Sequence, residues 1–151
     1  LGDLFVFIFF GPVGVTGSFF LHTGFFEADL LLPSFTSGLL SVAVLNLNNM
    51  RDMENDLRHN KITLAGIFGK SNSRFYHLVL ISAAIASSLL FSFINNFSFY
   101  KYIYCITFIP ALISLRKVFI YSDPANLDPE LRRTAVSNLI NSIGFGIVLL
   151  I

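Results

Sequence analysis

Charge is scarce in this sequence, and the few charges nearly cancel. Only 13% of the 151 residues are Asp, Glu, Lys or Arg, whereas a typical soluble domain carries about 25%. The net charge of +1 excludes the strongly basic surface that nucleic-acid binding requires, so no nucleic-acid partner is expected. Tryptophan is absent, and Cys105 is the only cysteine, which excludes a disulfide within the chain. These shortages argue against a water-soluble globular domain.

Hydrophobic residues are abundant instead, and they gather in five long runs. They make up 54% of the chain and include 18 Phe. Each run approaches the roughly 20 apolar residues that a helix needs to cross a bilayer. None shows the alternation of polar and apolar residues typical of a membrane β-barrel. We predict an all-α polytopic bundle that forms a single membrane domain over residues 1–151. Its five membrane helices are predicted at residues 4–21, 30–47, 78–94, 100–121 and 135–151.

The basic residues are distributed unevenly about these helices. Nine of the ten Lys and Arg fall on or beside the 51–77 and 122–134 connections, and only Lys101 lies at the other end. Short cytoplasmic connections of membrane proteins are enriched in Lys and Arg. We therefore predict a multi-pass protein of the inner (plasma) membrane whose 51–77 loop is cytoplasmic.

The last predicted helix carries polar residues where a helix surrounded by lipid would carry none. Ser137, Asn138, Asn141 and Ser142 fall on nearly one face of it. Polar groups in a membrane need partners, so this face is expected to point into the bundle or into a wet cavity. Asp128 precedes a proline at the expected start of this helix, and it is predicted to cap the helix N-terminus.

The clearest interruption of the apolar pattern reads NNMRDMENDLRHNKITL, residues 48–64. If the preceding helix continues past Asn48, then Asn48, Asp52 and Asp56 form one stripe at one-turn spacing. Two carboxylates at that spacing repel each other unless a cation lies between them. Carboxylate oxygens suit Mg²⁺, which takes one or two of them and completes its shell with water and substrate phosphate. The alternative interpretation is a solvated helix end of mixed charge.

Basic side chains flank these carboxylates. Arg51, Arg58 and Lys61 lie close in the sequence and are expected to meet the outer charge of a phosphate group. The pattern thus predicts half of a metal–diphosphate site at the cytoplasmic mouth of a membrane cavity. Its predicted metal ligands are Asp52 and Asp56, and its predicted cofactor is Mg²⁺.

The same stretch resembles the second aspartate-rich motif of the UbiA superfamily of membrane prenyltransferases. In the branch that prenylates 1,4-dihydroxy-2-naphthoate, this motif reads approximately N-N-x-R-D-x-x-x-D-x-x-x-G-K-x-T-L. The residues that match it are Asn48, Asn49, Arg51, Asp52, Asp56, Lys61, Thr63 and Leu64. The resemblance covers most of the chain: LGDLFVFIFFGPVGVTGSFF (residues 1–20) is similar to the family's fifth helix, and NLDPELRRTA (126–135) to the opening of its last.

The resemblance implies transfer of a polyprenyl group from polyprenyl diphosphate to an aromatic acceptor, within a lipid bilayer. In the most similar branch the acceptor is 1,4-dihydroxy-2-naphthoate, which loses its carboxylate as CO₂, giving demethylmenaquinone. By resemblance, the residues that act in catalysis are Asp52, Asp56 and Lys61. By the same resemblance, the substrate-binding residues are Asn48, Asn49, Arg51, Arg58 and Lys61.

The chain departs from the family pattern in three places. Asn60 replaces the usual glycine, although asparagine also adopts the left-handed conformation. Ile67 replaces a common arginine and so removes one candidate phosphate contact. The family's first aspartate-rich motif, N-x-x-x-D-x-x-x-D, is absent. We therefore expect these five helices to match the last five of the family's nine, with further residues before Leu1, and we expect this segment alone to be inactive.

Two other functions fit the same residues. One is a different branch of the superfamily, such as a 4-hydroxybenzoate or haem-O prenyltransferase, because the acceptor pocket depends partly on the earlier helices. The other is a transporter or a non-enzymatic bundle in which residues 51–77 are only a charged connector. A CDP-alcohol phosphotransferase also uses aspartates and Mg²⁺, but its D-G-x-x-A-R signature is absent.

Overall fold

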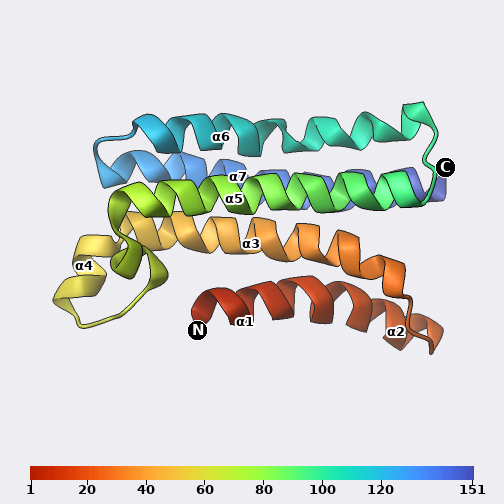
Figure 1. Cartoon of the computed structure of the whole chain (residues 1–151), viewed down its shortest axis with the longest axis horizontal. Helices are drawn as coiled ribbons and strands as arrows, with labels where there is room; N and C mark the ends of the chain where they lie inside the picture. The colour runs from red at the N-terminus through yellow and green to blue at the C-terminus, as the bar shows by residue number, and fades with distance from the viewer.

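The computed structural model describes residues 1–151, and every regular element in it is a helix (Figure 1). The labelled helices are α1 (Gly2–Ile8), α2 (Ser18–Thr23), α3 (Leu31–Arg51), α4 (Met53–Arg58), α5 (Leu64–Ile94), α6 (Ile109–Ile120) and α7 (Asp128–Leu150). A π-helical stretch, Phe9–Gly17, joins α1 to α2, and 3₁₀ turns cover Ala28–Leu30, Phe99–Phe108 and Pro124–Leu127. Together they build five segments long and apolar enough to cross a membrane. The predicted all-α bundle with five membrane helices is confirmed.

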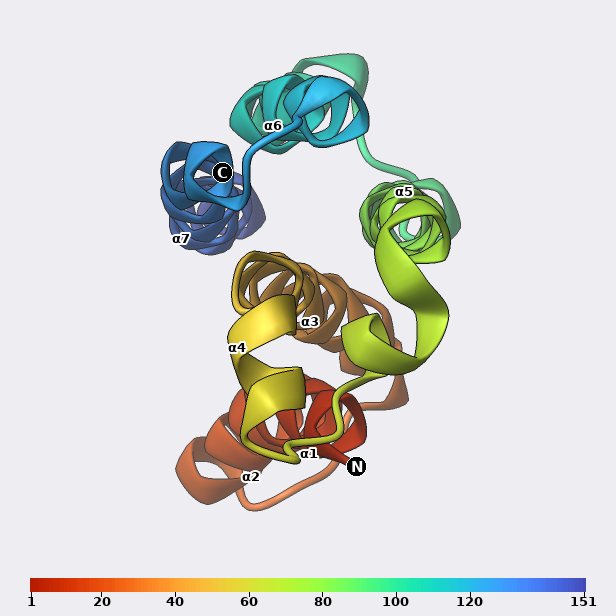
Figure 2. The same ribbon diagram turned by 90° about the vertical axis from the view of Figure 1, so that its left-hand side faces the viewer.

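The helices enclose two buried clusters. Seen from one end, α3, α5, α6 and α7 surround the centre of the bundle, and α1 lies on the outer side of α3 (Figure 2). The larger cluster fills the middle and includes Leu40, Ile81 and Tyr104. The smaller one, which includes Met50 and Leu127, lies where α3 ends and α7 begins. It fixes the end of α3 that carries the aspartate motif.

The first membrane segment bends where it touches α3. Gly11 lies outside the helical range, with φ −104° and ψ −105°, and Pro12 follows it. A proline inside a helix removes a backbone donor and commonly bends the helix. A Cβ atom added to Gly11 would lie 2.8 Å from the Ser34 carbonyl oxygen and 3.1 Å from the Gly38 Cα. Glycine at this bend therefore lets the two backbones approach closely.

Helix α5 begins much earlier than the apolar run predicts. It starts at Leu64 rather than at residue 78, so the prediction of a 51–77 loop is wrong for its second half. The Thr63 hydroxyl caps the helix by accepting a hydrogen bond from the Gly66 amide at 3.1 Å. Gly69 then bends the chain with φ 71° and ψ 173°. The polar residues between this bend and residue 77 are therefore helical.

Three of the four residues on the polar face of α7 bond between helices, as predicted, whereas Ser142 is exposed and donates to Asn138 of its own helix. Ser137 donates to the Thr107 carbonyl oxygen at 2.7 Å, and Asn141 donates to the Thr107 hydroxyl at 2.9 Å. Asn138 donates to the Ser41 hydroxyl on α3 at 3.0 Å. These bonds tie α7 to the 3₁₀ segment Phe99–Phe108 and to α3.

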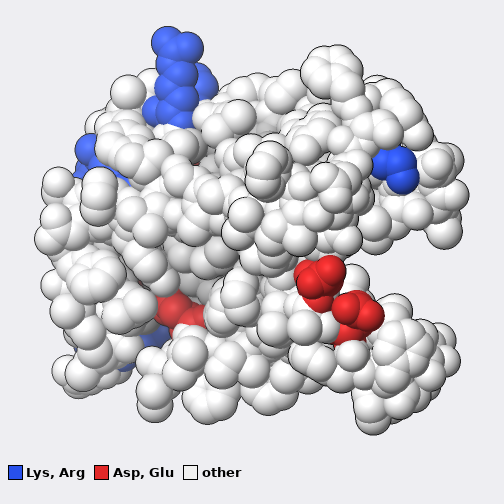
Figure 3. All heavy atoms as spheres, turned by 45° about the vertical axis from the view of Figure 1, so that its right-hand side comes forward, with Lys and Arg blue, Asp and Glu red and all other residues white.

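Charge is concentrated at the ends of the bundle. Figure 3 shows a largely uncharged face, and most of its blue surface lies toward the end that carries α4 in Figure 1. At that end, the Lys70 ammonium and the Arg74 guanidinium lie 4.5 and 4.6 Å from the centre of the Tyr121 ring. Burial raises the pKa of Tyr121, so its hydroxyl stays neutral and its ring remains a partner for both cations.

Candidate metal and diphosphate site

The aspartate motif lies where α3 gives way to α4. Helix α3 continues past Asn48 to Arg51, as the predicted stripe requires, and Asp52, with φ −91° and ψ 4°, then separates it from α4. The backbone hydrogen bonds nevertheless continue across the bend. The Asp52 amide donates to the Asn48 carbonyl oxygen at 3.0 Å, and the Asp56 amide to the Asp52 carbonyl oxygen at 2.8 Å. The one-turn spacing of the three residues therefore survives the interruption.

Arg51 is the centre of the first group of side chains in the site. Its Nε and Nη2 atoms donate to the two carboxylate oxygens of Asp52 at 2.8 and 2.9 Å. Nη2 also donates to the Asn48 amide oxygen at 2.8 Å, and Nη1 donates to Asp128 at 2.8 Å. The hydrogen bonds from Arg51 lower the pKa of Asp52 below its ordinary value, so this carboxyl is ionised at neutral pH.

Asp56 and Lys61 form a second pair. The Asp56 side chain is only 9% exposed, and one of its oxygens accepts a hydrogen bond from the Lys61 ammonium at 3.0 Å. A Schellman turn brings Lys61 back to this position. Its two bonds run from the Lys61 amide to the Asp56 carbonyl oxygen, 2.9 Å, and from the Asn60 amide to the Leu57 carbonyl oxygen, 3.2 Å. Asn60 has φ 55°, which confirms the predicted left-handed conformation.

Two predicted substrate-binding residues do not join these groups. Asn49 is buried and makes no hydrogen bond to either aspartate, although it follows Asn48 directly. Arg58 is exposed and forms no ion pair with Asp52 or Asp56. The structure thus brings Asn48, Arg51 and Asp52 together and pairs Asp56 with Lys61. Asn49 and Arg58 belong to neither group.

Asp128 is a residue of the site that the sequence analysis placed elsewhere. The prediction that it caps α7 is wrong, because it lies within the first turn of that helix and its carboxylate binds Arg51. Helix α7 has no side-chain cap, whereas Asp123 caps the preceding 3₁₀ turn by accepting from the Ala125 amide at 2.9 Å. Arg51 and Asp128 are 77 positions apart, so no local pattern could have linked them.

The carboxylates suit a metal that needs few protein ligands. The structure contains no group of three or more Asp, Glu, His or Cys side chains that could hold a metal ion. Asp52 and Asp56 offer hard oxygen donors, and Mg²⁺ commonly takes only one or two such carboxylates. Both oxygens of Asp52 accept from Arg51 and one oxygen of Asp56 accepts from Lys61. The second oxygen of Asp56 has no such partner, whereas a metal at Asp52 would share its oxygens with the guanidinium of Arg51.

An apolar groove begins beside Asn48 and runs along α1, α3 and α7. Its volume is about 430 Å³. It is lined by Val6, Phe10, Ser41, Val44, Leu45, Asn48, Leu131, Ala135 and Asn138. Because Asn48 also accepts from Arg51, the groove adjoins the charged group directly.

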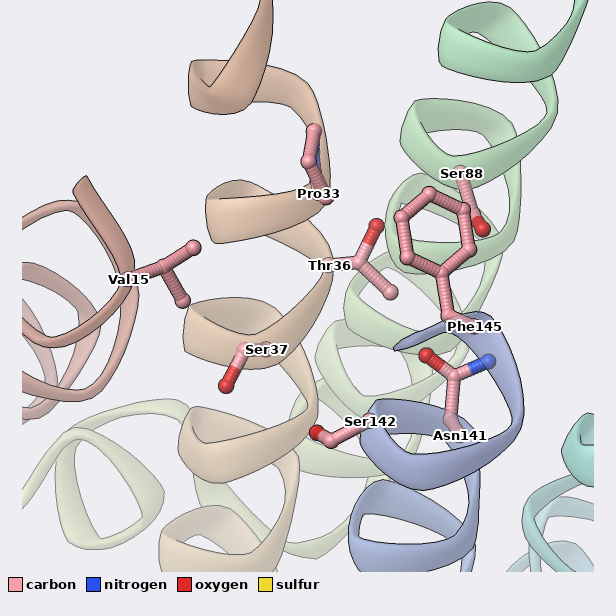
Figure 4. A pocket seen from close by; sticks show the side chains of 8 residues that line it. All are labelled: Val15, Pro33, Thr36, Ser37, Ser88, Asn141, Ser142 and Phe145. Carbon is pink, nitrogen blue, oxygen red and sulfur yellow. The ribbon is translucent and has the colours of Figure 1, made fainter. Parts of the chain in front are cut away.

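A second cavity lies deeper in the bundle and is separate from the aspartates. It has a volume of about 160 Å³ and is lined by residues that include Thr36, Ser37, Asn141 and Ser142. In Figure 4 the Thr36 side chain points from α3 toward Phe145, whereas Ser37 lies on the side of α3 toward Val15. Thr36 donates to the Ala84 carbonyl oxygen at 3.2 Å and Asn141 to Thr107, so these polar groups serve the contacts between helices. Asn48 lies three turns further along α3, which places this cavity outside the metal and diphosphate site.

The chain is similar to known proteins of one family. Residues 1–131 match the UbiA prenyltransferase family. A 1,4-dihydroxy-2-naphthoate octaprenyltransferase of Haemophilus influenzae is 37% identical over 100% of this chain and 49% of its own length. The enzyme of the same name from Escherichia coli is 34% identical over 96% of this chain and 47% of its own length. The human UbiA prenyltransferase domain-containing protein 1 is 30% identical over 99% of this chain and 43% of its own length.

The chain thus spans about half the length of the curated relatives it matches. No solved structure matches it significantly.

Proposed function

This chain belongs to the UbiA prenyltransferase family, and we propose that it forms part of a membrane enzyme that prenylates 1,4-dihydroxy-2-naphthoate. The donor is a polyprenyl diphosphate. The observation that carries the proposal is the juxtaposition of Asp52 and Asp56 with Arg51 and Lys61 at one end of a membrane bundle. Two relatives named for octaprenyl transfer to this acceptor support the choice of substrate.

In the proposed reaction the carbon–oxygen bond of the prenyl diphosphate breaks, and its electron pair leaves with the diphosphate. The acceptor ring forms the new carbon–carbon bond and loses its carboxylate as CO₂. The organic product is demethylmenaquinol, the reduced form of demethylmenaquinone. Charge accumulates on the leaving diphosphate, so the site must supply positive charge where that group departs.

Mg²⁺ is the proposed cofactor, and it would neutralise part of the charge on the leaving diphosphate. Asp52 and Asp56 are the proposed ligands, because the two residues lie one turn apart where α3 gives way to α4. Arg51 and Lys61, once released from these carboxylates, are proposed to donate to phosphate oxygens. Arg58 is exposed and unpaired with either aspartate, so it is free to approach the same group from solution.

The groove beside Asn48 is the proposed place for the first part of the prenyl chain. It joins an apolar wall, including Val44 and Leu45, to a polar end at Asn48. A prenyl diphosphate has the same division between a hydrocarbon tail and a charged head. Binding the head at Asp52 would therefore direct the tail along α3 between α1 and α7.

A direct assay tests this function. The complete enzyme that contains this chain, purified with Mg²⁺ and octaprenyl diphosphate, is expected to convert 1,4-dihydroxy-2-naphthoate to the prenylated quinol. Mass spectrometry would detect the product, and CO₂ release should match it in amount. Product from 4-hydroxybenzoate alone would assign the enzyme to another branch of the family. Absence of product from both acceptors would contradict the proposed transferase.

The membrane orientation is a separate proposal: the end that carries α4 faces the cytoplasm of a cell whose plasma membrane holds the protein. It is supported by the concentration of Lys and Arg at that end. Lys70→Cys and Glu27→Cys, each in a Cys105→Ala background, place one thiol at an exposed position at each end. An impermeant thiol reagent added to intact cells is expected to label position 27 and to spare position 70. The reverse pattern would overturn the orientation.

A further inference from the structure

Arg51 is held by side chains from two helices that are remote in sequence. Four hydrogen bonds leave its guanidinium: two to Asp52, one to Asn48 and one to Asp128. An arginine has five N–H donors, so this one is nearly saturated. The two sides of the guanidinium have different partners. Nε and Nη2 face the motif, whereas Nη1 points to the first turn of α7.

The bond pattern conflicts with metal binding at Asp52. A cation at Asp52 would compete with the guanidinium for the two carboxylate oxygens and would repel its charge, so metal binding there would weaken the hold of Asp52 on Arg51. Without another carboxylate, Arg51 would then lose the protein counter-charge that fixes its position. Asp128 supplies that second carboxylate at 2.8 Å, from a helix that does not belong to the motif.

We propose that Asp128 is a positioning residue that retains Arg51 at the site when a magnesium–diphosphate group takes over Asp52. This inference rests on the proposed function. Nη1 stays on Asp128, while the Nε and Nη2 edge that Asp52 releases turns to the phosphate oxygens. That edge presents two parallel donors, the arrangement by which arginine binds carboxylate or phosphate. Asn48 fixes the same edge from the α3 side through Nη2.

Binding of an unreactive donor analogue tests the assignment without turnover. The probe is a prenyl thiodiphosphate, titrated into the complete enzyme with Mg²⁺ and again with EDTA. Asp128→Asn is expected to weaken binding in Mg²⁺ by roughly fivefold to tenfold, because one charge-assisted hydrogen bond to Arg51 is lost. Asp128→Glu is expected to recover part of the loss. Asp123→Asn is the matched control, since it removes a carboxylate from the same connection that bonds only to its own turn.

A double-mutant cycle separates positioning from general attraction. In an Arg51→Lys background, Asp128→Asn is expected to weaken binding of the analogue by less than twofold, because no guanidinium remains for Asp128 to hold. An equal loss in both backgrounds would overturn the assignment, as would equal losses from Asp128→Asn and Asp123→Asn. A loss of affinity for the aromatic acceptor as large as that for the analogue would also overturn it, because it would indicate general disruption.

The proposed function has its own control in the same titration. Asp52→Asn must weaken Mg²⁺-dependent binding of the analogue if Asp52 is a metal ligand. If Asp52→Asn weakens binding and Asp128→Asn does not, only the role of Asp128 fails. If Asp52→Asn leaves binding unchanged, the metal site fails, and the role of Asp128 fails with it.

Discussion

Asp52→Asn and Asp56→Asn are each expected to reduce prenyl transfer by the complete enzyme at least about 100-fold at ordinary Mg²⁺ concentrations. Asparagine keeps the size of the side chain and one oxygen but removes the charge that would hold the metal. The measurement is the initial rate of quinol formation over a series of Mg²⁺ concentrations. Raising Mg²⁺ is expected to restore part of the activity, since weakened metal binding is overcome by mass action.

Folding is expected to survive both substitutions. Asp52→Asn leaves Arg51 with Asp128 and Asn48 as partners. Asp56→Asn leaves Lys61 without its carboxylate, but the Lys61 side chain is 56% exposed and can be hydrated. Amounts of membrane-inserted protein should therefore change little, and low expression cannot account for the loss of activity.

Glu54→Gln is the matched control for the aspartates. Glu54 lies on α4 between them, is exposed and forms no ion pair, so the substitution removes one negative charge from the same helix without touching either pair. It is expected to retain near-normal turnover. If both aspartate variants behaved like Glu54→Gln, the motif would be only a charged helix end and the transferase proposal would lose its main support.

The fold could be predicted from the sequence where a single physical property decides it. Five long apolar runs with few charges favour membrane helices, and the runs give all five segments. The turn after α4 could likewise be predicted from a single local property. Asn60 tolerates the left-handed conformation that a Schellman ending requires, and the chain uses it there.

The rest depends on contacts that no local pattern contains. Hydropathy places the start of α5 at residue 78, because Lys70 and Arg74 interrupt the apolar run. In the structure both lie within helix α5 and donate to backbone carbonyl oxygens just beyond α6, at Ser122 and Tyr121. Asp128 is missed for the same reason. Its local sequence suits a helix cap, whereas its carboxylate is used by a residue of α3 that only the folded bundle brings near.

Lys61→Ala is expected to separate the binding of phosphate from the binding of metal. Its ammonium is the only cation that pairs with Asp56 in the structure. Under the proposed function, a metal at that carboxylate would release Lys61 beside the diphosphate. Removing it should raise the KM for polyprenyl diphosphate about tenfold or more, by loss of a charge-assisted contact, and leave the KM for the aromatic acceptor unchanged.

The Mg²⁺ dependence of Lys61→Ala is the decisive measurement, because its direction is opposite to that of Asp56→Asn. In the proposed site, Mg²⁺ and Lys61 compete for the same carboxylate, which is only 9% exposed. Without that competitor, half-saturation should occur at an equal or lower Mg²⁺ concentration, whereas Asp56→Asn should require more. Lys61→Arg keeps the charge and should recover most of the affinity for the diphosphate. An increased Mg²⁺ requirement in Lys61→Ala would mean that Lys61 supports the metal site by holding Asp56 in place, and its proposed contact with phosphate would have to be abandoned.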